Sequence, residues 1–250
     1  MLGSASTSAG QSALAPTGVL RAVYLSTNPA HAVKDSATSE PRGTVVDVTQ
    51  ELGRRLGLQV ALVSVPTPQQ VIDAVQRGDA DIGFVAYNPE RAGPVEFSQP
   101  FMLVQQTFIV REASSIRAVA DIDRANQRIG AVKGDSIALY LARTLKQARL
   151  VEMPPGDTRV AVESVLSGSI DAFGANRQRL GDALRGATGL RLLPDDLYGV
   201  EQTIIVPKGK PEALTAVNRF IDDIRASGFL RRAIDRSGIA GVSVAPPRAK

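Results

Sequence analysis

The stretch Val71-Ile-Asp-Ala-Val-Gln-Arg-Gly-Asp-Ala-Asp81 has a second copy of its pattern in Ala161-Val-Glu-Ser-Val-Leu-Ser-Gly-Ser-Ile-Asp171. In both, apolar residues at helical spacing precede a glycine, and an aspartate then leads into a short apolar run. Glycine ends a helix readily because it adopts the left-handed conformation without a Cβ clash. A helix, a glycine cap and a buried strand form the end of a βαβ unit. The repeat therefore predicts two similar α/β lobes, and small ligands commonly bind between lobes.

The composition is that of a globular protein. The chain has 250 residues, of which 44% are apolar. This length suits one large domain or two lobes of roughly 100 residues each. No apolar run approaches the roughly 18–20 residues that a membrane span needs. Met1–Pro16 shows no basic region followed by an apolar block, so no secretory leader is predicted there. Residues 1–17 are expected to form a flexible tail outside the fold.

The residue counts exclude several kinds of site. There is no cysteine, which excludes disulfides and thiolate metal sites, and there is one histidine, His31. A zinc site built on histidines is excluded by that count. The net charge is +4, but the basic residues are scattered and aromatic residues make up only 4%. Nucleic-acid binders cluster their basic residues or interleave them with aromatic ones, so no nucleic-acid partner is expected. We expect no metal and no cofactor.

The hydropathy pattern predicts strands that alternate with helices along the whole chain, which indicates an α/β fold. The segment 28–42 is expected to be a loop, in which His31 is exposed. The chain from Val242 onward is expected to be frayed. The predicted helices cover 44–56, 68–77, 136–146, 158–166, 177–184, 211–226 and 228–237. The predicted strands cover 19–25, 58–65, 80–86, 101–111, 128–132, 150–153, 170–175, 190–193 and 202–206.

Several motifs in a fixed order carry a family resemblance. They include Pro89-Glu-Arg91, Val95-Glu-Phe-Ser-Gln-Pro-Phe101, Arg128-Ile-Gly-Ala-Val-Lys-Gly-Asp-Ser136 and Ile205-Val-Pro-Lys-Gly209. Each piece alone is weak, but their order and spacing together are specific. From about Gly18 to Ser237 the chain resembles the bacterial extracellular solute-binding proteins of family 3, the periplasmic amino-acid-type receptors of ABC importers.

The resemblance implies an α/β fold of the type II periplasmic-binding-protein class, with two α/β lobes joined by a two-strand hinge. Lobe 1 would comprise residues 18–104 plus 204–250, and lobe 2 residues 105–203. The hinge crossings would fall near Val104–Gln106 and Glu201–Thr203. A ligand would bind in the cleft between the lobes, and the hinge would close around it.

The function implied by the resemblance is that of the substrate-binding component of an ABC importer, located in the periplasm. Its partners would be a small organic carboxylate or amino-acid-like solute and a membrane permease, and a monomer is expected. On this reading the chain is not an enzyme. One alternative is an enzyme like cyclohexadienyl dehydratase on the same scaffold, with Glu201 as the general acid. A sensor domain is the least favoured reading, because no helix-turn-helix, coiled coil or membrane helix is predicted.

The resemblance implies two places on the chain that would bind the carboxylate of the ligand. Arg91 matches an arginine that pairs with the ligand carboxylate, and a guanidinium is a planar fork of donors suited to that group. Asp135 and Ser136 open a predicted helix, whose N-terminal N–H groups can bind an anion. The Ser136 hydroxyl matches one that donates to the same carboxylate. The alternative reading is that Asp135 or Ser136 only caps the helix.

The remaining candidates lie at other predicted strand ends and loops. Phe84, Ala86 and Tyr87 match a stretch that offers backbone carbonyls and hydroxyls, although Phe84 and Ala86 lack the hydroxyl. Asn28 lies in a loop that lines the mouth of the site. Asn176 occupies the place of an aspartate that pairs with the ligand ammonium, and a buried ammonium without a counter-charge is costly. Either Glu201 or Asp135 substitutes, or the ligand has no amine. The conspicuous residues Gly78, Asp81, Gly168 and Asp171 are expected to be structural.

Overall fold

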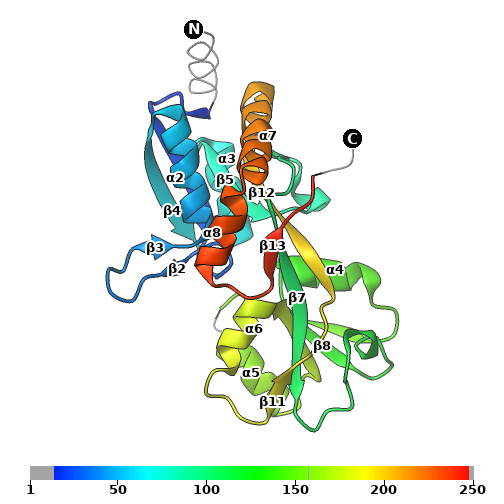
Figure 1. Ribbon diagram of the computed structural model, residues 1–250. Helices are drawn as coiled ribbons and strands as arrows, with labels where there is room; N and C mark the ends of the chain where they lie inside the picture. Colours follow the sequence, from blue (N-terminus) through cyan, green and yellow to red (C-terminus); the bar gives the residue numbers. More distant parts are fainter. Residues whose placement is uncertain (1–13, 157, 248–250) are drawn as a thin grey trace. The chain divides into compact units, whose positions relative to one another are not determined.

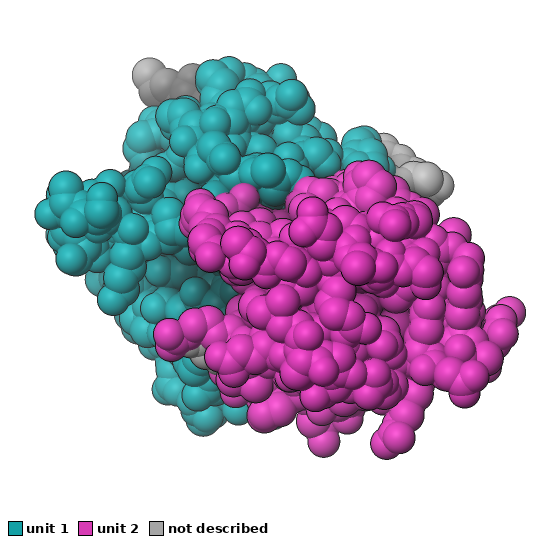
Figure 2. Space-filling view, turned by 90° about the horizontal axis from the view of Figure 1, so that it is seen from below, with its two compact units in different colours: residues 1–103, 201–250 teal, residues 104–200 magenta. Residues whose placement is uncertain are grey.

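The computed structural model describes residues 14–156 and 158–247. The chain forms two compact units, coloured separately in Figure 2. Unit 1 comprises Met1–Leu103 and Glu201–Lys250, and unit 2 comprises Val104–Val200. The chain passes from one unit to the other within two long strands, β7 (Met102–Arg111) and β12 (Tyr198–Pro207).

Unit 1 is a sheet covered by helices. Its sheet has the order β4-β1-β5-β12, in which β1 is parallel to β4 and β5, and β12 is antiparallel to β5. Helices α2 and α8 pack against each other (Figure 1). The strands are β1 (Val19–Leu25), β2 (Val33–Lys34), β3 (Pro41–Arg42), β4 (Gln59–Val65), β5 (Ile82–Ala86), β6 (Val95–Phe97) and β13 (Val242–Val244). The helices are α2 (Thr44–Leu56), α3 (Pro68–Arg77), the 3-10 helix η1 (Pro89–Arg91), α7 (Pro211–Ala226) and α8 (Phe229–Ser237).

Helix α3 shows why the first repeat folds as predicted. Thr67 caps its N-terminus in a reciprocal pair with Gln70, and Pro68 occupies the first helical position, where no N–H is needed. Val71, Ile72 and Val75 are buried on one face. Gly78 ends the helix with φ 75°, in the left-handed region.

Unit 2 has its own sheet, with the order β7-β10-β8-β9. Strand β8 is parallel to β9 and β10, whereas β10 is antiparallel to β7. Two apolar clusters, one around Phe108 and one around Phe173, form its core. The strands besides β7 are β8 (Arg128–Val132), β9 (Arg149–Met153), β10 (Ala172–Asn176) and β11 (Leu190–Leu192). The helices are the 3-10 helix η2 (Val119–Asp121), α4 (Ser136–Thr144), α5 (Thr158–Leu166) and α6 (Arg177–Leu184).

The aspartates of the repeat each bind an arginine on a neighbouring strand. In unit 1, Arg21 donates to both carboxylate oxygens of Asp81, at 3.1 and 2.6 Å, and to the Gly78 carbonyl at 2.7 Å. In unit 2, Arg128 does the same with Asp171, at 3.2 and 3.1 Å, and with the Gly168 carbonyl at 2.5 Å. These residues therefore hold strands and helix ends together, which is the structural role expected for them.

Two expectations about the chain ends need correction. The prediction that the chain frays from Val242 is wrong as far as the described residues extend, because β13 pairs with β7 and Ala245 is fully buried. The Ala245 N–H donates to the Phe101 carbonyl at 3.1 Å. At the other end, residues 1–13 of the expected tail lie outside the described residues, whereas Leu14 and Ala15 are buried.

Candidate ligand-binding site

In unit 1, several candidate residues meet at one edge of the sheet. The carboxyl ends of the parallel strands β1 and β5 lie at the same edge, and the antiparallel β12 enters unit 1 there. Ala86 is paired with Gln202, and the Tyr87 N–H donates to the Glu201 carbonyl at 2.8 Å. The register of β5 and β12 therefore brings Ala86, Tyr87 and Glu201 together.

Arg91 is positioned by a single helical turn that follows β5. The Asn88 side chain accepts a hydrogen bond from the Glu90 N–H, and Pro89 takes the first position of η1. This cap turns the chain back over the end of β5. The Nη1 atom of Arg91 donates to the Ala86 carbonyl at 3.2 Å, and the residue is half-buried. Arg91 and Ala86 therefore form one group.

The structure does not bring the Phe84 side chain into this group. Phe84 is fully buried and meets Phe101 edge to face, with ring centroids 5.8 Å apart. Its backbone is paired with Ile204 of β12. Phe84 is thus a core residue. It lies within β5, two positions before the strand ends at Ala86.

Asn28 lies in the loop after β1 and is 7% exposed. Its side-chain oxygen accepts from the Ala30 N–H at 3.2 Å, and its carbonyl accepts from the His31 N–H at 2.9 Å. The side-chain oxygen therefore shapes the loop at the same sheet edge as Arg91.

The expectation that His31 is exposed is wrong. His31 is fully buried, and its Nε2 atom lies 2.8 Å from Oε1 of Gln202. Burial lowers the pKa of His31 to about 4, against the smaller opposing effect of the Gln202 hydrogen bond. Among the described residues, its Nδ1 atom has no hydrogen-bond partner. His31 thus ties the loop after β1 to β12, through a contact between residues 171 positions apart.

In unit 2, the carboxyl ends of the parallel strands β8, β9 and β10 meet at one edge of the sheet. Asp135 follows β8 as the N-cap residue of α4, and Ser136 is the first helical residue. The Asp135 side chain makes no capping hydrogen bond, so it does not have the capping role offered as its alternative. The Ser136 carbonyl accepts from the Tyr198 hydroxyl at 3.2 Å, and the Tyr198 ring stacks on Tyr140.

Asn176 is the last residue of β10 and the N-cap of α6. Its Oδ1 atom accepts a hydrogen bond from the Arg179 N–H at 2.7 Å. Asparagine is among the best N-cap residues because its short side chain reaches the second or third N–H of the helix. The oxygen expected to face a ligand amine is therefore used to begin a helix.

Arg179 also lies at the strand ends of unit 2, beside Asp135. It contacts Asp135, Thr158 and the Gly156 carbonyl, and it lines a small cavity of about 100 Å³ beside Val132 and Phe173. No sequence motif marks it. The only signal was its place three residues after a capping asparagine, where a side chain lies on the first turn of a helix that starts at the strand ends.

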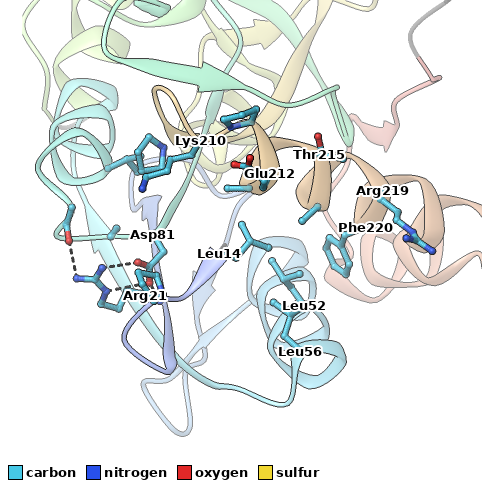
Figure 3. A pocket seen from close by; sticks show the side chains of 18 of the residues that line it. Leu14, Arg21, Leu52, Leu56, Asp81, Lys210, Glu212, Thr215, Arg219 and Phe220 are labelled. Carbon is cyan, nitrogen blue, oxygen red and sulfur yellow. Dashed lines mark hydrogen bonds and ion pairs between the residues drawn. The ribbon is translucent and has the colours of Figure 1, made fainter. Parts of the chain in front are cut away.

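Unit 1 also contains a larger groove, which Figure 3 shows from close by. Its volume is about 1110 Å³, and its walls come from α2, α3 and α7. It contains Arg21 and Asp81, which stand near the start of β1 and just before β5, whereas Ala86 and Arg91 follow the end of β5. None of the predicted ligand residues lines this groove.

Within residues 14–156 and 158–247, no cluster of three or more carboxylate or imidazole side chains is arranged to hold a metal ion. The helices in this part of the chain are too short or too polar to cross a bilayer.

Comparison with known proteins decides the family. The model of the bacterial extracellular solute-binding proteins, family 3, matches residues 20–237. The chain belongs to that family. The family match confirms the predicted resemblance. The predicted fold class is confirmed as well, since solved type II periplasmic binding proteins have the same fold.

Among curated proteins, this family 3 chain matches the virulence sensor protein BvgS of Bordetella bronchiseptica and of Bordetella parapertussis. The identity is 24% over 196 residues in both cases, which is 73% of this chain. The chain spans about 15% of the length of these curated relatives.

Three solved structures illustrate the range of proteins that have a similar fold. The amino-acid ABC transporter substrate-binding protein AbpA from Streptococcus pneumoniae, bound to L-arginine, has TM-score 0.71 and 20% identity, covering 90% of this chain and 96% of its own. The ancestral amino-acid-binding protein AncCDT-1, a precursor of cyclohexadienyl dehydratase, has TM-score 0.71 and 22% identity, covering 90% and 98%. A histidine kinase sensor domain with similarity to periplasmic binding proteins has TM-score 0.74 and 17% identity, covering 91% and 98%.

Proposed function

We propose that the protein binds a small carboxylic acid or amino-acid-like solute, and that Arg91 binds the carboxylate. The proposal that it binds a solute is supported by its membership of family 3 over residues 20–237. The choice of Arg91 rests on its place at the strand ends of unit 1, where η1 directs its guanidinium toward the Ala86 carbonyl. A guanidinium matches a carboxylate in shape and charge, which a lysine ammonium does not do.

We propose that the candidates of unit 2 contact the same solute. Support comes from the helix α4, which starts with Asp135 and Ser136 at the carboxyl ends of parallel strands. In α/β sheets, ligands bind at this end of the strands. The N–H groups of the first turn of α4 point out of the helix and favour an anion.

The wider role that we propose is that of the periplasmic substrate-binding component of an ABC importer, acting as a monomer with a membrane permease. The family description and the amino-acid transporter neighbours support it. A ligand-sensing module is the second candidate, because the curated relatives are virulence sensors and one neighbour is a sensor domain. Deleting the gene distinguishes them: an importer component is required for uptake of its solute, whereas a sensor changes gene expression with uptake intact.

An enzymatic role is a third candidate, favoured by the structural neighbour that is a precursor of cyclohexadienyl dehydratase. Glu201 would be its general acid. The protein is incubated with cyclohexadienyl carboxylic acids, and product is measured. Product that disappears in Glu201→Gln supports an enzyme, and an unconsumed acid removes this candidate.

The binding function is tested by a thermal-shift screen over amino acids, oxo acids and dicarboxylates. A solute present at 100 times its Kd stabilises the folded state by about 2.7 kcal/mol. We expect Arg91→Ala to abolish the shift, and Arg91→Lys to restore little of it because the fork of donors is lost. Arg77→Ala is the matched control, since Arg77 is largely exposed and pairs with the exposed Asp79. A shift that survives in Arg91→Ala contradicts the role of Arg91.

A further inference from the structure

Arg179 is fixed inside unit 2 by three contacts from one guanidinium. Its Nε atom donates to Oγ1 of Thr158 at 2.8 Å, Nη1 to Oδ2 of Asp135 at 3.3 Å, and Nη2 to the Gly156 carbonyl at 3.4 Å. The side chain is 13% exposed. Arg179 therefore joins the segments that follow β8, β9 and β10, which form the candidate edge of unit 2.

The contact with Arg179 determines what the Asp135 carboxylate can do. Asp135 occupies the N-cap position of α4 without making a capping bond, and its side chain is 27% exposed. An unpaired carboxylate at this place would attract a cationic group on a solute. With Arg179 at 3.3 Å, its negative charge is opposed by an equal positive charge on a side chain that is only partly exposed. Asp135 then offers a solute little net negative potential.

The charges of the three segments act in the same direction. Residues 133–135, 154–159 and 177–179 contain four cationic side chains, those of Lys133, Arg159, Arg177 and Arg179. They contain two carboxylates, those of Asp135 and Asp157, the latter outside the described residues. Adding Asp196, which binds Arg177, gives four positive charges against three negative ones. A surplus of positive charge favours an anion and disfavours an ammonium group.

We propose that Arg179 determines specificity by neutralising Asp135, so that the protein selects small carboxylic acids without an amino group, such as 2-hydroxy or 2-oxo acids. The inference rests on the proposed function, in that the strand ends of unit 2 contact the solute. Arg179 acts through Asp135 and is not itself assigned a contact with the solute.

The test compares acids in pairs that differ only in the group at C2: leucine with 2-hydroxy-4-methylpentanoate, glutamate with 2-hydroxyglutarate, and phenylalanine with 3-phenyllactate. Affinities for the full chain are measured by calorimetry. The quantity compared is the ratio of the two affinities in a pair, hydroxy acid over amino acid. In the wild type we expect the hydroxy acid of the best-bound pair to bind at least about tenfold more tightly than its amino acid. Arg179→Gln keeps an amide donor near Thr158 but removes the charge, and we expect it to shift the ratio toward the amino acid by about tenfold.

Three further variants isolate the cause. Arg177→Gln is the control, because it removes one positive charge from the same helical turn but its partner is Asp196, and we expect it to change the ratio clearly less than Arg179→Gln does. The double variant Arg179→Gln with Asp135→Asn should return the ratio to the wild-type preference. Asp135→Asn alone tests the inference even where Arg179→Gln does not fold, because it should leave amino acids the poorer ligands.

The outcomes separate this inference from the proposed function. Binding of no acid in any pair by the folded wild type contradicts the proposed function itself. Binding of the amino acid more tightly than its hydroxy partner overturns the inference while leaving the carboxylate site intact. The inference is also overturned where folded Arg179→Gln leaves the ratio unchanged, or where Asp135→Asn abolishes amino-acid binding that the wild type shows.

Discussion

Asp81 accepts three hydrogen bonds from Arg21, one from its backbone N–H and two from its guanidinium, while its own N–H donates to the Arg21 carbonyl at 2.8 Å. The Asp81 side chain is 5% exposed and that of Arg21 is 32% exposed. This pair thus closes β1 onto the end of the glycine-capped helix α3, and Arg128 and Asp171 form the equivalent pair in unit 2.

Asp81→Asn is expected to reduce the free energy of unfolding by about 1.5–3 kcal/mol, because charged hydrogen bonds are lost at a buried site. Asp171→Asn should cost less, since the Asp171 side chain is 21% exposed. Denaturant titration measures both. Asp79→Asn is the control, since Asp79 and Arg77 are both largely exposed. Equal losses in Asp79→Asn and Asp81→Asn would show that burial of the pair is unimportant.

The buried His31 should make the protein less stable in mild acid. Its folded-state pKa is about 4, below the ordinary value of 6.5, so the unfolded chain binds the proton more tightly. The contribution is complete above pH 6.5 and is lost as the pH falls toward 4. Its size is about 3 kcal/mol, from 1.36 kcal/mol for each pH unit. His31→Gln keeps a donor for Gln202, and its loss of unfolding free energy between pH 7 and 4.5 should be smaller than that of the wild type by about 2 kcal/mol. Parallel curves for the two proteins would contradict it.

Ser98 explains part of the motif Phe97-Ser-Gln-Pro-Phe101. It is fully buried, its N–H donates to the Ile204 carbonyl, and its Oγ accepts from the Ile204 N–H, both at 2.9 Å. Ser98→Ala leaves that N–H buried without a partner, which should cost about 1–3 kcal/mol. Ser164→Ala, at a partly exposed helical serine whose hydroxyl bonds only within its own helix, should change the unfolding free energy little. Similar unfolding free energies for the two variants would contradict a stabilising role of the hydrogen bond between Ser98 and Ile204.

Gly174 allows α4 to pack directly on β10. A Cβ atom there would lie 2.6 Å from Cδ1 of Ile137 and 2.7 Å from Cε1 of Phe108, all within a packed core. Gly174→Ala should destabilise the protein by about 1–3 kcal/mol through overpacking. Because Ile137 follows Ser136, binding of the solute should weaken as well. Gly181→Ala is the control, since its Cβ would meet no atom within 4 Å. Full stability in Gly174→Ala would contradict this packing.

Sequence patterns predicted the elements that depend on local contacts. Gly78 and Gly168 ended helices as expected, because a C-cap needs only a residue that tolerates the left-handed region. The strand β13 and the burial of His31 were missed, since each depends on a partner far along the chain. Nothing in the segment 28–42 indicates that Gln202 covers it.

The candidate site was predicted unevenly for the same reason. The motif Pro89-Glu-Arg91 indicated Arg91 because the turn that holds it is local, formed by the cap at Asn88 and the proline after it. The sequence did not indicate that Arg179 binds Asp135. The two residues are 44 positions apart, and the pairing of β8 with β10 brings them together.

His31 has a practical consequence for spectroscopy. It is the only histidine in the chain, so its imidazole gives one set of ring-proton resonances. Those resonances come from a point where the loop after β1, the start of α2 and β12 meet. A natural, label-free NMR reporter therefore lies beside the loop that contains Asn28, and its chemical shift can be followed while candidate solutes are titrated in.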